Sequence, residues 1–545
     1  MPDCPKNDLI FRGAKAPVPL TERTKSGKTS FERCRLPRVF LKPEARRNMN
    51  GFGKRFTLVT MLGILLMFGF VLAACDSESD AQDEEPLDRS APLTRLSAEG
   101  TKIVNAEGHA LRLRGVNLGG WIFHEPWITL SAYSLRARIH ELGTRETFSA
   151  QVDDVLEELG RSDKAPDYLD RFGAALNAKL GSPEVGRFLS DIRTFDVSLD
   201  DDSDLPLRRK LATRFGEDER DELMDAFQSA WITEKDIAFI AEQGFNVVRV
   251  PMSYRDLTRG ADLDKPAVLL WNERTFSRLD ALLGWCAEHR IYAVLDIQEA
   301  PGGQNDYSGT AQLYDDPAMQ TMTVKLWEEL SRRYSFHDEI AAYSLLAEPY
   351  GAPDAEARDA MYDLLVKAIR AKNDNHMLII HDGFKGMTTL PAPQEMGWDN
   401  VVYSTHIFEF DATSKGYYEE RINLYYDTLF KAGQKDQNVP YYIGSFSTQV
   451  DESWAYEAAE LLLSWYAERG WSWSIWTYKK LDEPLDNRLW DYRTCYGVRG
   501  GQVPSGFQRP DPEKDDLETL KAKFSAYADM ELTPNQSLLD IMKKY

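Results

Sequence analysis

The chain has 545 residues, of which 43% are hydrophobic and 28% charged, and its formal net charge is -22. This composition is typical of a soluble globular protein, and the length admits either several domains or one α/β barrel with insertions. An acidic surface repels phosphate backbones, so we expect no nucleic-acid partner.

The N-terminal region has the order of an export signal. Lys54 and Arg55 precede an apolar run, and small residues follow that run up to Cys75, as in a signal peptide. Met49 stands directly before this pattern. We therefore predict that residues 49–74 are the signal and that residues 1–48 are a mis-assigned start or a disordered extension.

The residues around Cys75 indicate how the signal is processed. The sequence LAAC at residues 72–75 resembles the lipobox of bacterial lipoproteins. The resemblance implies cleavage before Cys75, acylation of its thiol and attachment to the inner or the outer membrane of the cell envelope. A single transmembrane helix is the alternative, because the apolar run is only just long enough to span a bilayer. Residues 75–94 are predicted to be an acidic tether.

The remaining residues, 95–545, are predicted to form one large domain. It begins with a β-hairpin that turns at Glu107-Gly108. Apolar runs then alternate with helical segments, and they are apolar on both faces, as buried parallel strands are. This pattern predicts a (β/α)8 TIM barrel. The eight runs are LRLRGVNL, NVVRVP, YAVLDI, AAYSLLAE, MLIIHDG, VVYSTH, YYIGS and WSIWTY.

A helical insertion is predicted after the first strand, at about residues 131–215. Phe148, Val152, Val155 and Leu159 recur there at helical spacing. The cysteines show no metal-ligand spacing and the chain shows no cofactor motif, so we expect neither a metal nor a cofactor.

Polar residues stand at the C-terminal ends of the predicted strands, where barrels of this kind have their active sites. Polar groups that bond hydroxyls, together with an indole face, suit a sugar ligand. The strand-end residues are Asn117, Arg249, Gln298, Glu299, Glu348, His406, Ser445 and Trp476.

Several motifs in this region resemble glycoside hydrolase family 5, especially its exo-β-1,3-glucanase-type members. They are LRGVNLGGWIFHEPWIT, WITEKDIAFIAEQGFNVVRVPMSY, YAVLDIQEAPGGQNDYSG, YSLLAEPYG and WSIWTYK, and they run from about Leu96 to Lys479. The resemblance implies hydrolysis of O-glycosidic bonds in β-glucan or a related glycan. It leaves the linkage, the mode of cleavage and the oligomeric state open.

Four residues match the site of that family. The resemblance implies that Glu348 is the acid/base, that Arg249 supports the nucleophile, and that His406 and Trp476 contact the sugar. Asn117 and Asn305 are further candidates for substrate binding. From the residues alone, Arg249 could instead form a barrel salt bridge.

Four positions depart from the family pattern. Gln298 stands where the family has histidine, Ala347 where it has asparagine, and Phe408 where it has tyrosine. Ser445 occupies the position of the nucleophilic glutamate. Retaining hydrolysis needs two carboxylates about 5 Å apart, and a serine without a neighbouring base is a poor nucleophile.

Three functions therefore remain open. The protein is a glycosidase, a glycan-binding pseudo-glycosidase, or an altered inverting glycosidase in which Glu348 works with another carboxylate. Glu299 is the candidate for that second carboxylate, whereas we expect Glu409 and Asp411 to be exposed. Trp121 and Trp127 either line sugar subsites or pack the barrel mouth.

Overall fold

The computed structural model describes residues 89–131, 135–159, 168–181, 183–192, 205–259, 268–305, 311–409, 412–423, 434, 436–448, 454–482, 497–502 and 506–545. The predicted signal at residues 49–74, Cys75 and Asp411 lie outside these ranges. No helix of the described segments is both long and apolar enough to cross a membrane.

Eight parallel strands close into a barrel in the order β10-β11-β12-β3-β4-β7-β8-β9, which confirms the predicted (β/α)8 fold. All eight coincide with the apolar runs of the sequence. They are β3 (Arg114–Asn117), β4 (Val247–Ser253), β7 (Tyr292–Glu299), β8 (Ile340–Ser344), β9 (Met377–His381), β10 (Val401–Phe408), β11 (Tyr441–Ser447) and β12 (Ser472–Ile475).

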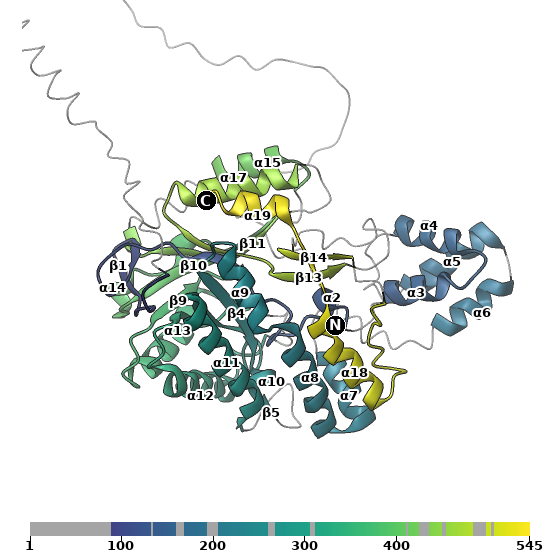
Figure 1. Ribbon diagram of the computed structural model, residues 1–545, viewed down its shortest axis with the longest axis horizontal. Coiled ribbons are helices and arrows are strands. Elements are labelled where there is room, and N and C mark those ends of the chain that lie inside the picture. Colours follow the sequence, from purple (N-terminus) through teal and green to yellow (C-terminus); the bar gives the residue numbers. More distant parts are fainter. Residues whose placement is uncertain are drawn as a thin grey trace, which may run out of the picture. The chain divides into compact units, whose positions relative to one another are not determined.

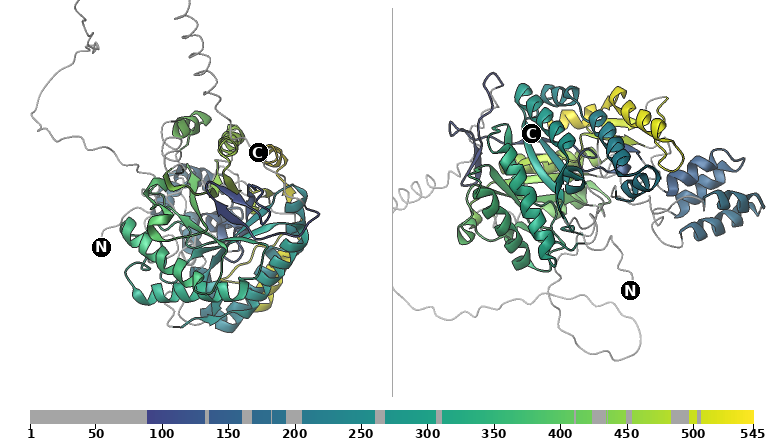
Figure 2. Two further views of the ribbon diagram at one scale, coloured as in Figure 1. Left: turned by 90° about the vertical axis from the view of Figure 1, so that its left-hand side faces the viewer. Right: turned by 90° about the horizontal axis from the view of Figure 1, so that it is seen from below.

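Helices follow the strands and lie outside them, as Figures 1 and 2 show. The buried faces of these helices and the outer faces of the strands form one large apolar core. The helices are α9 (Glu234–Glu242), α11 (Glu273–His289), α12 (Pro317–Tyr334), α13 (Ala355–Arg370), α14 (Pro393–Met396), α15 (Lys415–Arg421) and α17 (Ala455–Ala467).

The N-terminal hairpin turns where the sequence predicts. Strand β2 (Lys102–Val104) pairs with β1 (Ser97–Glu99) on one side. On the other side Val104 bridges to Ala110 across a turn that contains Gly108, whose φ is +81°. Glycine tolerates this left-handed conformation without a steric cost.

The segment expected to be a helical insertion is helical, but it divides into two parts. Helices α3 (Leu135–Gly143), α4 (Ser149–Leu159), α5 (Tyr168–Leu180) and α6 (Pro183–Ile192) have an apolar core of their own. Helix α7 (Leu205–Phe215) instead joins the main core with α8 (Glu217–Trp231) and α18 (Leu517–Ser525), and these three lie together in Figure 1.

Short elements complete the described chain. They are α2 (Pro126–Thr129), α10 (Tyr254–Leu257), β5 (Thr258–Arg259), β6 (Leu270–Trp271), η3 (Met387–Thr389), β13 (Lys479–Asp482), β14 (Arg499–Gln502), η6 (Ala526–Asp529), β15 (Thr533–Pro534) and α19 (Gln536–Met542).

Strands β3 and β4 lie close together because residue 115 is a glycine. This contact gives a first prediction. A Cβ at Gly115 would lie 1.8 Å from the carbonyl oxygen of Val247, so Gly115→Ala must push the strands apart. We expect a loss of about 3 kcal/mol or more in the free energy of unfolding, measured by urea denaturation.

Gly284 provides the matched control. It is exposed on α11, and a Cβ there meets no atom within 4 Å. Gly284→Ala should therefore stabilise the protein by about 1 kcal/mol through helix propensity alone. Equal effects of the two substitutions would contradict the packing argument.

Candidate active site

Arg249 lies at the centre of the polar residues at the strand ends. It projects from β4, is 1% exposed, and donates to Asn117 Oδ1 at 2.7 Å, to Asp296 Oδ2 at 2.7 Å and to Gln298 Oε1 at 2.9 Å. These partners lie on the neighbouring strands β3 and β7. The barrel salt bridge considered from the sequence is thus present, as the pair Arg249–Asp296.

Asn117 extends this network to the other side of the barrel. Its Nδ2 donates to the carbonyl oxygens of Gly444 at 3.2 Å, Ser474 at 3.1 Å and Ile475 at 3.1 Å. Both ends of the amide therefore bond to the protein, and the contact with Gly444 fixes the backbone directly before Ser445. Asn117, predicted to contact substrate, here positions strands β11 and β12.

Glu348 and His406 form a close pair. His406 Nδ1 lies 2.6 Å from Glu348 Oε1, and the side chains are 3% and 18% exposed. Burial raises the pKa of Glu348 from 4.5 to about 7, although the positive charge of Arg249 opposes this shift. Burial and Arg249 hold the pKa of His406 well below its usual range. The imidazole therefore stays neutral, and the glutamate keeps its proton up to about neutral pH.

Two side-chain amides bond the backbone of the loop that carries Glu348. Glu348 has a φ of +50°, a conformation that costs a non-glycine residue about 1–2 kcal/mol. Asn305 Nδ2 donates to the Glu348 carbonyl at 3.0 Å, and Gln304 Nε2 donates to the Ala347 carbonyl at 2.9 Å. Asn305 was predicted to bind substrate, and the structure shows its amide nitrogen holding the backbone of the acid.

Ser445 lies opposite His406 in the register of β10 and β11, next to an irregularity after Thr405. The residue is 2% exposed, and among the described residues its Oγ has no hydrogen-bond partner. A buried hydroxyl without a partner costs about 1–3 kcal/mol. Among the described residues, none accepts a hydrogen bond from this hydroxyl as a base would.

The aromatic candidates differ in how far they are buried and in what they contact. Trp476 is 7% exposed and crosses Gly119, where a Cβ would lie 3.2 Å from two indole carbons. Its peptide bond to Thr477 is cis. Phe408, at the end of β10, is half-buried. Trp121 is 1% exposed and donates to the Gln228 carbonyl at 2.8 Å, so of its two interpretations the structure favours packing.

The candidate second carboxylates are already engaged. Glu299 is fully buried, ion-paired with Arg255 and hydrogen-bonded to the Ser253 hydroxyl. Glu409 is 2% exposed and accepts from Arg421 Nε at 3.0 Å. The expectation that Glu409 is exposed was therefore wrong, because the arginine that follows in α15 compensates its burial.

Two buried residues near the site escaped the sequence analysis. His381 ends β9, and its ring meets that of His406 edge-on with centroids 4.4 Å apart. Asp382 follows, accepts from the N–H groups of Phe384 at 3.0 Å and Gly386 at 2.9 Å, and has a pKa raised to about 6 by burial. Both residues lie in the motif MLIIHDG, where a polar pair directly after an apolar strand could have indicated them.

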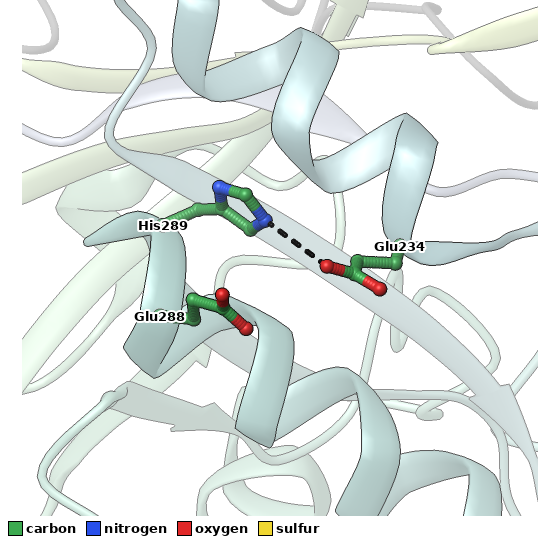
Figure 3. A group of neighbouring side chains, drawn as sticks. All are labelled: Glu234, Glu288 and His289. Atoms are coloured by element: carbon green, nitrogen blue, oxygen red, sulfur yellow. Dashed lines mark ion pairs between the residues drawn. The ribbon is translucent and has the colours of Figure 1, made fainter.

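One group in the described part of the chain has the spacing of a metal site. It consists of Glu234 at the start of α9 and Glu288 and His289 at the end of α11. Figure 3 shows the imidazole of His289 directed at Glu234, with 3.8 Å between Nε2 and Oε1. Both glutamates are exposed, so the group is adequately explained as surface charges, which commonly pair without a metal.

Part of the chain is similar to a known protein family. Residues 216–482 match the family model described as cellulase (glycosyl hydrolase family 5). The match includes every strand of the barrel except β3.

Individual relatives carry glycosidase names. The chain is 27% identical over 417 residues to a beta-xylosidase of Phanerodontia chrysosporium, covering 71% of each protein. It is 30% identical over 207 residues to endoglucanase C of Acetivibrio thermocellus, covering 37% of this chain and 59% of the relative. It is 25% identical over 314 residues to a probable glucan 1,3-beta-glucosidase A of Emericella nidulans, covering 55% and 58%. The chain thus spans less than two thirds of the last two relatives.

The raised pKa of Glu348 makes a second prediction. The folded protein holds this proton more tightly than the unfolded chain, so stability falls as pH rises from 4.5 to about 7. Glu348→Gln keeps an N–H donor for His406 but cannot ionise. Between pH 4 and pH 8 the variant should gain up to about 3 kcal/mol of stability relative to wild type.

Urea denaturation at both pH values measures this difference. Glu356→Gln is the control, because Glu356 is exposed on α13. The difference in stability between this variant and wild type should be the same at pH 4 and pH 8. Parallel pH profiles for wild type and Glu348→Gln would rule out the raised pKa.

Proposed function

We propose that this protein recognises a β-linked glucan or a related glycan at the C-terminal ends of the barrel strands and that Glu348 is a general acid toward the glycosidic oxygen. The observation that supports this most directly is the pair of Glu348 with a neutral His406, within the field of Arg249. The cellulase-family match and the relatives named for β-glycosidase activities support the glycan class.

The geometry suits proton donation. Cleavage of a glycosidic bond requires a proton on the leaving oxygen, and a general acid works best with a pKa near the operating pH. Burial supplies this pKa for Glu348, whose pKa is about 7. The neutral imidazole of His406 orients the carboxyl group without neutralising it.

Ordinary retaining hydrolysis does not fit the site equally well. It needs a second carboxylate about 5 Å from the acid, and Ser445 stands on the strand beside His406 instead. Glu299 is the alternative carboxylate, but its ion pair with Arg255 opposes a role as base. Glycan recognition with an intact proton donor is the function that these residues support best, and a non-cleaving glycan-binding protein is the alternative.

For localisation we propose a lipid-anchored protein of the bacterial cell envelope. The support is the basic, apolar and small-residue order of residues 49–74 and the cysteine that follows. The acidic tether after Cys75 would let the domain extend from the membrane surface.

A third prediction tests glycan recognition. We expect Trp476→Ala to weaken the binding of β-1,3- or β-1,4-gluco-oligosaccharides at least about tenfold, because an indole face covers the apolar face of a sugar ring. Isothermal titration calorimetry measures the affinity. Trp285→Ala, on α11, should leave it unchanged. Equal affinity of wild type and Trp476→Ala would remove Trp476 from the site, and no binding by wild type would refute the proposed function.

A fourth prediction tests the anchor. In a bacterial host, Cys75→Ala should abolish incorporation of labelled fatty acid and release the protein from the membrane fraction. Cys286→Ala changes a cysteine buried in α11 and should leave labelling intact. Labelling that persists in Cys75→Ala would refute lipidation at this residue.

A further inference from the structure

We propose that the site accepts inorganic phosphate beside Ser445 and uses it as the nucleophile, so that the β-glycosidic bond is cleaved by phosphorolysis with inversion at the anomeric carbon. This inference rests on the proposed function, since it requires a bound β-glycan and Glu348 as the acid. It adds a second substrate and a different product.

The first support is the state of Ser445. Its hydroxyl is buried, has no hydrogen-bond partner among the described residues, and lies opposite His406 in the strand register. The amide of Asn117 holds the preceding residue, Gly444, by its carbonyl, so the backbone that leads into Ser445 is held in place. An oxyanion beside Ser445 would satisfy the hydroxyl proton with a charge-assisted hydrogen bond, which is stronger than a neutral one.

The second support is the electrostatic field. Arg249 opposes the rise that burial gives the pKa of Glu348 and adds to the lowering of the pKa of His406, and the same guanidinium is ion-paired with Asp296. Serine, unlike glutamate, brings no negative charge to this field. An anion next to Ser445 would supply the charge that stabilises an oxocarbenium-like transition state.

The third support is that the other carboxylates in the described site already have partners. Asp296 is paired with Arg249, Glu299 with Arg255 and Glu409 with Arg421. Asp382 accepts two backbone N–H groups. A water nucleophile needs a base to remove its proton, whereas hydrogen phosphate is already an anion and attacks without one. An acid without a base therefore favours a nucleophile that arrives charged.

The reaction balances in atoms and charge. An oxygen of hydrogen phosphate forms a bond to the anomeric carbon, and the bond from that carbon to the leaving oxygen breaks. Glu348 gives its proton to the leaving oxygen, which departs as an alcohol. The glycosyl phosphate formed still carries the proton of hydrogen phosphate and returns it to Glu348. The sum is β-glycoside plus hydrogen phosphate giving α-glycosyl phosphate plus alcohol.

Phosphate fits the proton transfer better than an anion that carries no proton. A phosphate monoester has a second pKa of about 6, below the pKa of about 7 of Glu348. The proton that the product carries is therefore available to return to Glu348 and reset the site. A nucleophile such as azide brings no proton and leaves Glu348 to be recharged from solvent.

The experiment uses the full-length protein with β-1,3- and β-1,4-gluco-oligosaccharides, in inorganic phosphate or in sulfate at the same pH and ionic strength. Phosphorus NMR identifies the product and its anomeric configuration. We expect α-glycosyl phosphate in phosphate, and bond cleavage at least about 100-fold slower in sulfate, which corresponds to the loss of one essential electrostatic group. Glu348→Gln should form no product.

Substitutions at Ser445 separate this reaction from hydrolysis. Ser445→Glu should lose the dependence on phosphate and hydrolyse the glycan in sulfate buffer. Ser445→Gln is its neutral match and should neither phosphorolyse nor hydrolyse. Circular dichroism and glycan affinity, measured on each variant, show whether the fold and the binding are retained.

The outcomes distinguish the two proposals. Glycan binding without any glycosyl phosphate would overturn the phosphorolysis and leave the proposed recognition standing. Equal cleavage in phosphate and sulfate would overturn phosphorolysis and identify a hydrolase. A β-configured glycosyl phosphate would overturn the single inverting displacement. Failure to bind any oligosaccharide would overturn the proposed function and, with it, this inference.

Discussion

The buried guanidinium of Arg249 is the constraint on which the site depends. A buried charge is tolerated only when it is paired and hydrogen-bonded, and Arg249 meets this condition through Asp296, Gln298 and Asn117. Asn117 in turn donates to the backbone carbonyls of Gly444, directly before Ser445, and of Ser474 on β12, so the network joined to Arg249 reaches strands β11 and β12. The charge of Arg249 also affects the pKa values of Glu348 and His406. The residue that orders the strand ends therefore also influences which side chain carries the proton.

The resulting site separates two roles that retaining glycosidases assign to two carboxylates. Glu348, the proposed acid, is half-buried beside His406, and its loop is held by Asn305 and Gln304. The buried Ser445 stands where the family resemblance predicts the second carboxylate. The positive φ of Glu348 costs energy, and two amides hold the loop in that conformation. The proposed donation of a proton to a bound glycan would explain why this arrangement is kept. The proposed use of phosphate as a second substrate would account for a proton donor together with a serine.

Much of the fold could be predicted from the sequence, since buried parallel strands are apolar on both faces and all eight runs became barrel strands. The placement of site residues at strand ends followed from the same pattern. Predictions failed where a partner distant in the sequence decides the outcome. Glu409 was expected to be exposed but is buried against Arg421. Asn117 and Asn305 bond the backbone of other segments, and their contact with a glycan stays a prediction.

The sequence by itself determined the barrel and the order of its elements, because these depend on the local apolar pattern, and it placed a serine at position 445. Only the tertiary structure decided which carboxylates are already paired, which hydroxyl is left without a partner and how far burial raises the pKa of Glu348. Those properties depend on distances and on the exclusion of water between residues such as Glu348 and His406, which are 58 positions apart in the chain. Local patterns carry no information on such contacts, because they form only when the barrel closes.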